Sequence, residues 1–300
     1  MKEIKIMSSS KKVIITGASG LIGKEIITPL KEAGFDIYAL TIDVNNPVIE
    51  GVTWVPCNIF DNKKTKEIFN YIKPQYLIHL AWVVTENYIT SNLNFDFLKS
   101  SLGLLKFFHD AGGKRAVFTG TCLEYGQKAI PLKENDTIEP LGIYGKCKNY
   151  LREIAEIYCT NNNISFAWGR IFYVYGKGEH PKRLTASIIN SLKENKPIQV
   201  NHAQLHRDYI YTKDIAGALT ELLKSDINGI VNICSGKSIS IGEYTEKIAK
   251  KLGKEDLLIL KELPTPQPAK IIGNNTRLTE EVKYKIKYDI DIALDEILHN

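Results

Sequence analysis

The chain has 300 residues, of which 44% are apolar and 24% are charged, and its formal net charge at pH 7 is +5. This composition indicates a globular protein with a packed core and excludes a disordered chain. No apolar run reaches the length of about 18 residues that spans a bilayer, and residues 1–12 lack the apolar centre of a signal peptide. The lysines form no basic run with interleaved aromatic residues. We therefore expect a cytoplasmic protein that binds neither nucleic acid nor a membrane.

The cysteines are odd in number and show no CxxC spacing, so they indicate neither a disulfide framework nor a zinc site. We expect free thiols and no metal site. The five residues are Cys57, Cys122, Cys147, Cys159 and Cys234.

Short apolar runs alternate with helical patterns through residues 11–170. Strands rich in Val and Ile that alternate with helices indicate βαβ units and a parallel sheet. The pattern predicts an α/β fold with a Rossmann-type, doubly wound parallel sheet that carries a dinucleotide site. The alternation becomes irregular in residues 171–300, which we expect to form a smaller, mixed part that binds substrate, with some segments returning to the sheet. Residues 1–10 are expected to be a loose tail.

Three glycines, Gly17, Gly20 and Gly23, stand between the first predicted strand and the first predicted helix. In this context the first glycine permits a tight turn, the second lets the backbone approach a pyrophosphate, and the third lets the helix pack against the strand. The helix also presents free N–H groups to the anion. The spacing predicts a dinucleotide-binding loop. The loop residues expected to contact the cofactor besides the glycines are Ser19, Leu21 and Ile22.

The end of the second predicted strand distinguishes NAD from NADP. A carboxylate at this position binds the 2′-hydroxyl of NAD and excludes a 2′-phosphate. Thr41 occupies the position, so NADP is permitted; however, Asp43 lies two residues on, and no arginine follows to bind a phosphate. We favour NADPH and keep NAD as the alternative.

Tyr144 precedes Lys148 by one helical turn, and Thr121 ends an earlier predicted strand. A tyrosine with a pKa of about 10 is a poor acid-base group at neutral pH, and a nearby ammonium favours the phenolate. A hydroxyl from Thr121 would hold the oxygen that the tyrosine protonates. Chance produces a Tyr-x-x-x-Lys pair easily in a chain with 15 tyrosines. Its combination with the glycine loop and Thr121 favours a catalytic trio.

Several motifs together resemble the extended short-chain dehydrogenase/reductases, the superfamily of NAD(P)-dependent nucleotide-sugar epimerases and dehydratases. The resemblance extends from about residue 11 to residue 295. The motifs are TGASGLIG (16–23), LIHLAW (77–82), GTCLEYG (120–126), YGKCK (144–148), GRIFYVYG (169–176) and HRDYIYTKDIAGAL (206–219).

The resemblance implies roles for individual residues. Tyr144 would be the acid-base group, Lys148 its electrostatic partner and a contact of the nicotinamide ribose, and Thr121 the third member of the trio. Arg207 would bind the substrate diphosphate, for which a guanidinium is well suited, and His180 would lie near the sugar. The alternative for Arg207 is a surface ion pair with Asp208. Further cofactor contacts are implied for Asn58, Ile59, Leu80 and Ala81.

Members of this superfamily often form homodimers through two long helices near the active site, and residues 95–111 and 148–160 are the candidate segments here. Burial in the core explains their apolar stripes equally well.

The residues after Thr121 bear on the reaction. Dehydratases of the superfamily carry acidic residues there, whereas this chain has Cys122 and Leu123. Glu124 is one residue too late, and on an alternating strand it would face the other way. The chain is most similar to the 4-ketoreductases of nucleotide-linked deoxysugars. We therefore expect NADPH-dependent reduction of a 4-keto sugar nucleotide, with Tyr144 as proton donor.

Two other functions remain open. An NAD-dependent nucleotide-sugar 4-epimerase is the main alternative, because it uses the same trio. A dinucleotide-binding redox sensor without catalysis would be expected to lack the tyrosine or the lysine, and both are present.

Overall fold

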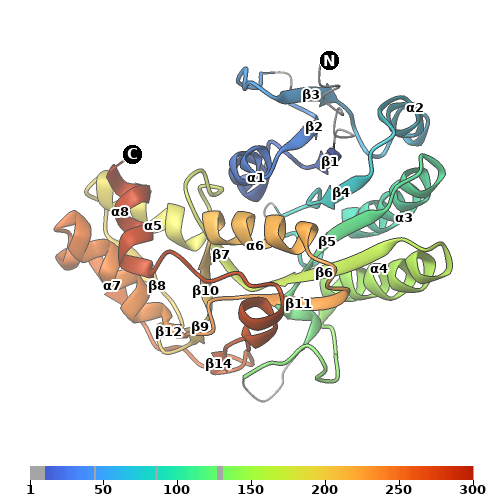
Figure 1. The fold of residues 1–300 in the computed structure, drawn as a ribbon. Helices are drawn as coiled ribbons and strands as arrows, with labels where there is room; N and C mark the ends of the chain where they lie inside the picture. Colours follow the sequence, from blue (N-terminus) through green and yellow to red (C-terminus); the bar gives the residue numbers. More distant parts are fainter. Residues whose placement is uncertain (1–10, 44, 85–86, 127–130, 300) are drawn as a thin grey trace.

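The computed structural model describes residues 11–43, 45–84, 87–126 and 131–299, so the predicted tail at residues 1–10 lies outside the described residues. At its centre is a seven-stranded sheet in the order β11-β6-β5-β4-β1-β2-β3, and every neighbouring pair is parallel (Figure 1). This arrangement confirms the predicted Rossmann-type fold. The strands are β1 (Lys11–Thr16), β2 (Phe35–Thr41), β3 (Val52–Pro56), β4 (Tyr76–His79), β5 (Arg115–Thr121), β6 (Ser165–Ile171) and β11 (Gly229–Ile233).

Helices cover both faces of this sheet (Figure 1). On one face lie α1 (Leu21–Glu32) and α6 (Thr212–Lys224), and on the other lie α2 (Asn62–Ile72), α3 (Leu93–Asp110) and α4 (Gly142–Asn161). From β1 the chain runs outward to β2 and β3, and then returns to β4 on the other side of β1. In such open parallel sheets, ligands bind outside the carboxyl ends of the strands at the point where the strand order reverses.

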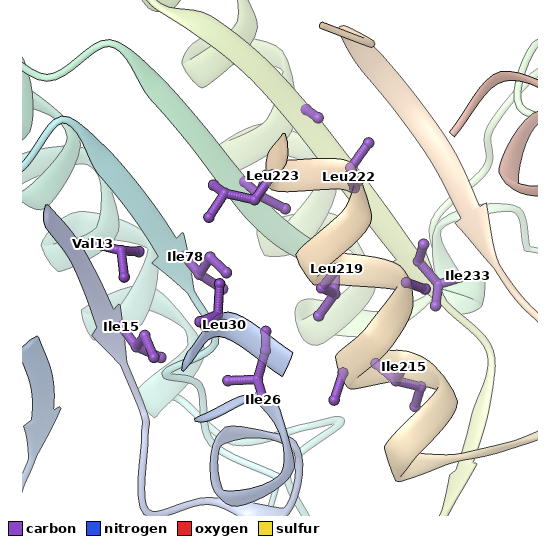
Figure 2. Packing of buried hydrophobic residues seen from close by; sticks show 14 of the residues in the cluster. Val13, Ile15, Ile26, Leu30, Ile78, Ile215, Leu219, Leu222, Leu223 and Ile233 are labelled. Atoms are coloured by element: carbon purple, nitrogen blue, oxygen red, sulfur yellow. The ribbon is translucent and has the colours of Figure 1, made fainter. Parts of the chain in front are cut away.

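Alternation along β1 explains why both faces are buried. Val13 and Ile15 point to the side of α1 and α6, where they join Ile26 and Ile215 (Figure 2). Ile14 belongs to the cluster on the opposite face. All five side chains are fully buried. Since each buried aliphatic side chain of this size contributes about 1.5–3 kcal/mol, the two clusters hold the strand ends in place.

Three helices of the second half, α5 (Leu184–Lys193), α7 (Ile241–Leu252) and α8 (Ile290–His299), lie together at one end of the molecule (Figure 1). Three small sheets accompany them. These pair β7 (Tyr173–Tyr175) with β10 (Tyr209–Tyr211), β9 (His206–Arg207) with β12 (Ile239–Ser240) and β14 (Lys270–Ile271), and β8 (Ile198–Val200) with β13 (Leu258–Leu260). The short helical turns are η1 (Cys122–Glu124), η2 (Glu255–Leu257) and η3 (Arg277–Glu281).

Two further observations bear on the sequence predictions. All five cysteines are buried free thiols, as expected. Among the helices of the described residues, none has the length and apolarity needed to cross a bilayer.

Candidate functional site

The glycine loop touches the end of β4. Gly17 has φ +70°, and a Cβ at this position would lie 2.8 Å from the backbone nitrogen of Ala81. A Cβ at Gly23 would overlap the carbonyl oxygen of Gly17. The first glycine therefore allows the turn and the close approach to Leu80 and Ala81, and the third lets α1 pack directly on the loop.

The N-terminus of α1 faces this loop with unpaired donors. Gly20 is the N-cap residue and supplies no side-chain cap, so the amides of Leu21 and Ile22 have no partner within the helix. These amides and the helix dipole attract an anion. The close backbone approach and the uncapped helix end fit the pyrophosphate of a dinucleotide.

Thr41 lies at the carboxyl end of β2, beside the loop. Its buried hydroxyl donates to Ser19 Oγ at 3.0 Å and accepts a bond from the backbone N–H of Asp43 at 2.9 Å. Asp43 itself is exposed. At the end of β2, the Thr41 hydroxyl is therefore hydrogen-bonded to the glycine loop, whereas the Asp43 carboxylate lies at the protein surface.

The other residues predicted to contact the cofactor are at the ends of neighbouring strands. Leu80 N–H donates to Thr16 O at 3.2 Å, which joins the end of β4 to that of β1. Asn58 and Ile59 follow β3 and Cys57, whose N–H donates to Thr41 O at 2.8 Å. The structure thus brings the residues predicted for the cofactor to one edge of the sheet.

A buried histidine supports this edge. His79 Nε2 lies 2.7 Å from Ser101 Oγ, and Nδ1 lies 2.7 Å from Thr16 Oγ1. The Ser101 hydroxyl donates to Phe97 O, so it accepts from Nε2–H, and Nδ1 accepts from Thr16. Burial lowers the pKa of His79 to about 3, and the ring stays neutral. No role for His79 is predicted from the sequence.

Thr121 and Tyr144 meet where β5 ends and α4 begins. The Thr121 side chain lies beside the Tyr144 phenol, and the Tyr144 N–H donates to Ile89 O at 3.2 Å. Burial of the phenol is the largest influence on Tyr144 and raises its pKa, with a further increase from Tyr88. The phenol therefore holds its proton at neutral pH.

Lys148 lies one turn further along α4, but its ammonium points elsewhere. Lys148 Nζ donates to Thr119 O at 2.8 Å and lies 3.9 Å from the ring centroid of Trp82, a favourable cation–π distance. Trp82 is fixed by a 2.8 Å bond from its indole N–H to Asn94. We expected Lys148 to lower the pKa of Tyr144. Instead, the ammonium binds the strand carbonyl and the indole face, and burial determines the pKa of the phenol.

Glu124 corrects one expectation from the sequence. It ends the short helical turn η1 rather than continuing an alternating strand, because Thr121 and Glu124 form a capping box that stops β5. Its fully buried carboxylate accepts bonds from Thr121 N–H at 2.8 Å and from Arg170 Nε at 3.0 Å. Glu124 is therefore held by the protein and is not free to shuttle a proton. The Thr-x-x-Glu spacing was the available sequence signal.

Arg207 and His180, which are predicted to contact substrate together with Thr121, differ in their surroundings. Arg207 is 2% exposed and donates to His206 O, Pro268 O and the Gln267 side chain. Asp208 instead accepts bonds from Ser235 and Gly236, so the alternative of a surface Arg207–Asp208 pair is wrong.

His180 is exposed, and its Nδ1 accepts a bond from the Lys182 N–H at 3.3 Å. By contrast, the buried guanidinium of Arg207 lies 5.5 Å from the ring centroid of Tyr173. A hollow of about 1480 Å³ between α7 and residues 286–292 contains neither the trio nor the glycine loop.

Lys148→Met tests the burial of the ammonium. Burial lowers the pKa of Lys148 from 10.5 to about 7, so between these values the unfolded chain binds a proton that the folded chain has lost. Below pH 7 the folded protein bears the full free-energy cost of burying the charged ammonium of Lys148. This cost falls as the pH rises, because the buried side chain loses its proton. We expect the unfolding free energy of the wild type, relative to Lys148→Met, to increase by more than about 1 kcal/mol from pH 6 to pH 9 in urea titrations. The exposed Lys146→Met is the control, and a pH-independent difference for Lys148→Met would contradict the expectation.

Comparison with known proteins identifies relatives that are named as dehydrogenases, reductases or epimerases. The dTDP-6-deoxy-L-talose 4-dehydrogenase (NAD(+)) of Aggregatibacter actinomycetemcomitans is 27% identical over 78% of this chain and 88% of its own length. The dTDP-4-dehydro-6-deoxyglucose reductase of Escherichia coli is 26% identical over 95% of this chain and 96% of its own length. The UDP-glucose 4-epimerase of Thermotoga maritima, solved with UDP-glucose, matches the fold with a TM-score of 0.88 at 20% identity, covering 96% of this chain and 97% of that one.

The family described as the NAD dependent epimerase/dehydratase family matches residues 13–234. This stretch contains the glycine loop, Thr121, Tyr144, Lys148 and Arg207. Because the match covers well over half of the chain, the protein belongs to the NAD-dependent epimerase/dehydratase family.

Proposed function

We propose that the protein is an NADPH-dependent reductase of a 4-keto sugar nucleotide, in which C4 receives hydride and Tyr144 donates the proton to the oxygen. The observation that carries this proposal is the position of the buried Tyr144 phenol beside the buried Thr121, at the edge of the sheet that also holds the glycine loop. The names of two relatives, a 4-dehydrogenase and a 4-dehydro-sugar reductase, describe oxidation and reduction at the same carbon.

The nicotinamide cofactor supplies the hydride when bound, and the glycine loop and the amides of α1 fit its pyrophosphate. Thr121 would hold the carbonyl oxygen, and Tyr144 would protonate it as the carbon is reduced. Burial keeps the phenol protonated, which suits a proton donor. Lys148 would contact the ribose, and Arg207 would place a positive charge near the diphosphate. His180 is exposed, and we propose that it lies near the sugar.

The residues after Thr121 support reduction over dehydration. Burial raises the pKa of Cys122 to about 12, so this thiol stays neutral, and Leu123 has no proton to give. The carboxylate of Glu124 is paired with Arg170 at 2.9 Å. A dehydratase needs an acid-base group at this place, and these side chains do not supply one.

An NAD-dependent 4-epimerase is the second candidate. Ile42 and the exposed Asp43 follow Thr41, so the tip of β2 has no guanidinium for a 2′-phosphate. An epimerase needs the same trio but keeps its cofactor through a full oxidation and reduction.

We infer a cytoplasmic location because all five thiols are free.

We also propose that a second copy of the chain packs on α4. Tyr150, Ile154 and Ile157 form an apolar stripe along this helix and are 52%, 47% and 64% exposed. Burial in the core therefore does not explain the apolar character of these three residues, and a stripe at this spacing is typical of a helix–helix interface.

Residues 171–300 would supply most of the substrate-binding surface.

Tyr144→Phe removes only the hydroxyl. We expect kcat for a 4-keto-6-deoxy sugar nucleotide to fall by about 10²–10⁴-fold, while the Kd for NADPH stays unchanged. Turnover is followed by the absorbance of NADPH, and Tyr71→Phe, at an exposed position of α2, is the control. Near wild-type kcat in Tyr144→Phe would remove this residue from the chemistry, and a wild type that reduces none of these substrates would overturn the proposed reaction.

Thr41→Asp tests the choice of cofactor. The wild type should have a higher kcat/KM with NADPH than with NADH, and the new carboxylate should lower this ratio by at least about tenfold, because it repels the 2′-phosphate. Thr53→Asp, on the exposed side of β3, controls for the added charge. A strong preference of the wild type for NADH would show that the cofactor is NAD.

Ile154→Asp with Ile157→Asp tests the dimer. Light scattering should give twice the chain mass for the wild type and the monomer mass for the double variant, because two buried carboxylates would oppose association. Ile292→Asp on α8 is the control. A monomeric wild type at micromolar concentration would contradict the proposal.

A further inference from the structure

The lysine of the trio lies on the face of an indole. Lys148 Nζ is 3.9 Å from the ring centroid of Trp82, and it also donates to Thr119 O at 2.8 Å. The lysine is 3% exposed and the tryptophan 9% exposed, so little water solvates the ammonium. An aromatic face attracts a cation, most strongly in tryptophan, and the attraction grows when the pair is desolvated. The indole therefore replaces part of the hydration that Lys148 loses on burial.

A hydrogen bond fixes the orientation of this indole. The Trp82 N–H donates to Asn94 Oδ1 at 2.8 Å. Asn94 lies on α3 and is fully buried, and its side-chain amide donates to the carbonyls of Tyr88 and Ser91 at 2.7 and 2.8 Å. Phe97, also on α3, stacks on the indole with 5.4 Å between the ring centroids. The plane of the indole is thus set by α3 and not by the lysine.

The same indole lies next to the proton donor. Its ring stands edge-on to that of Tyr144, with 6.5 Å between the centroids. Tyr88, whose carbonyl binds Asn94, also stands edge-on to Tyr144, at 4.9 Å. In the same loop, Ile89 O accepts a bond from the Tyr144 N–H. Aromatic pairs at these distances attract each other. The indole and the phenol therefore belong to one packed unit at the catalytic edge.

The charges around Lys148 show what the indole adds. Burial lowers the pKa of Lys148 to about 7, and the negative charge of Glu124 opposes this shift. The Glu124 carboxylate is already paired with Arg170 at 2.9 Å. Burial, and then the charge of Lys148, lower the pKa of His79 to about 3, so this ring is neutral, as is the buried phenol of Tyr144. The indole face therefore supplies an attraction that these groups supply only in part.

We propose that Trp82 is a positioning residue of the reduction: its indole holds the Lys148 side chain at the catalytic edge and favours the charged ammonium. The inference rests on the proposed function. In that reaction the C4 carbonyl gains hydride from the nicotinamide, its oxygen takes the proton of Tyr144, and the ammonium stabilises the phenolate that is left. An ammonium has three N–H donors, so the Thr119 carbonyl and the indole leave one for the ribose.

The test measures the protonation of Lys148 directly, by NMR titration of the full chain with ¹³C-labelled lysine. The signal that is missing in Lys148→Met identifies this residue. Trp82→Leu keeps an apolar side chain but removes the aromatic face, and the titration midpoint of Lys148 should fall by about one pH unit. Trp82→Phe keeps a weaker aromatic face, so its midpoint should lie between those of the wild type and Trp82→Leu.

Two further measurements separate the aromatic face from packing. Tryptophans with increasing numbers of fluorine atoms, introduced at position 82 alone, keep the shape of the indole and withdraw charge from its face. They should lower the midpoint stepwise, and they also serve if Trp82→Leu does not fold. Trp54→Leu removes an indole on β3, which is bonded to Pro47 O, and should leave the midpoint unchanged.

The pH dependence of kcat links the indole to the reaction. If the reaction uses the ammonium, kcat for a 4-keto sugar nucleotide should fall as the pH rises through the pKa of Lys148. In Trp82→Leu this fall should occur at a pH lower by about one unit, whereas a loss of packing alone would lower kcat equally at every pH. At pH 8 kcat should change more than KM.

An unchanged Lys148 midpoint in Trp82→Leu or across the fluorinated series would overturn the inference, as would an equal shift in Trp54→Leu. Failure of the proposed function looks different. In that case the midpoint would shift with each change at Trp82, and yet the protein would reduce no 4-keto sugar nucleotide.

Discussion

The pairing of Glu124 with Arg170 determines the geometry of the catalytic edge. Both side chains are fully buried, and the carboxylate also accepts bonds from the Thr121 N–H and from the Trp168 indole. A buried carboxylate without its partner would destabilise the fold by several kcal/mol, so the end of β5 stays bound to β6 as long as this region is folded. Thr121 is thereby fixed by its backbone, and its hydroxyl accepts a bond from the Leu123 N–H at 3.3 Å. The end of β5 that lies beside Tyr144 is thus held by an ion pair that is fully buried in the protein.

Burial also explains the protonation states of Tyr144 and Lys148. Burial raises the pKa of the Tyr144 phenol and lowers that of the Lys148 ammonium to about 7, which brings the lysine near its titration midpoint at physiological pH. Glu124 opposes the second shift, since its negative charge favours the ammonium. The indole face of Trp82 adds a further attraction at 3.9 Å. The neutral state of the Tyr144 phenol and the partial charge of Lys148 thus result from their packing in the protein.

Local patterns in the sequence were sufficient for much of the fold. The alternation of apolar strands with helices predicts the parallel sheet, and the glycine spacing predicts the turn at Gly17, because both depend on neighbouring residues. The environment of Glu124 was mispredicted because a capping box, also a local signal, was interpreted as a continuing strand. The partner of Glu124, Arg170, was not predictable. Periodicity indicates which residues are buried, but it does not indicate which residue distant in sequence a buried charge will meet.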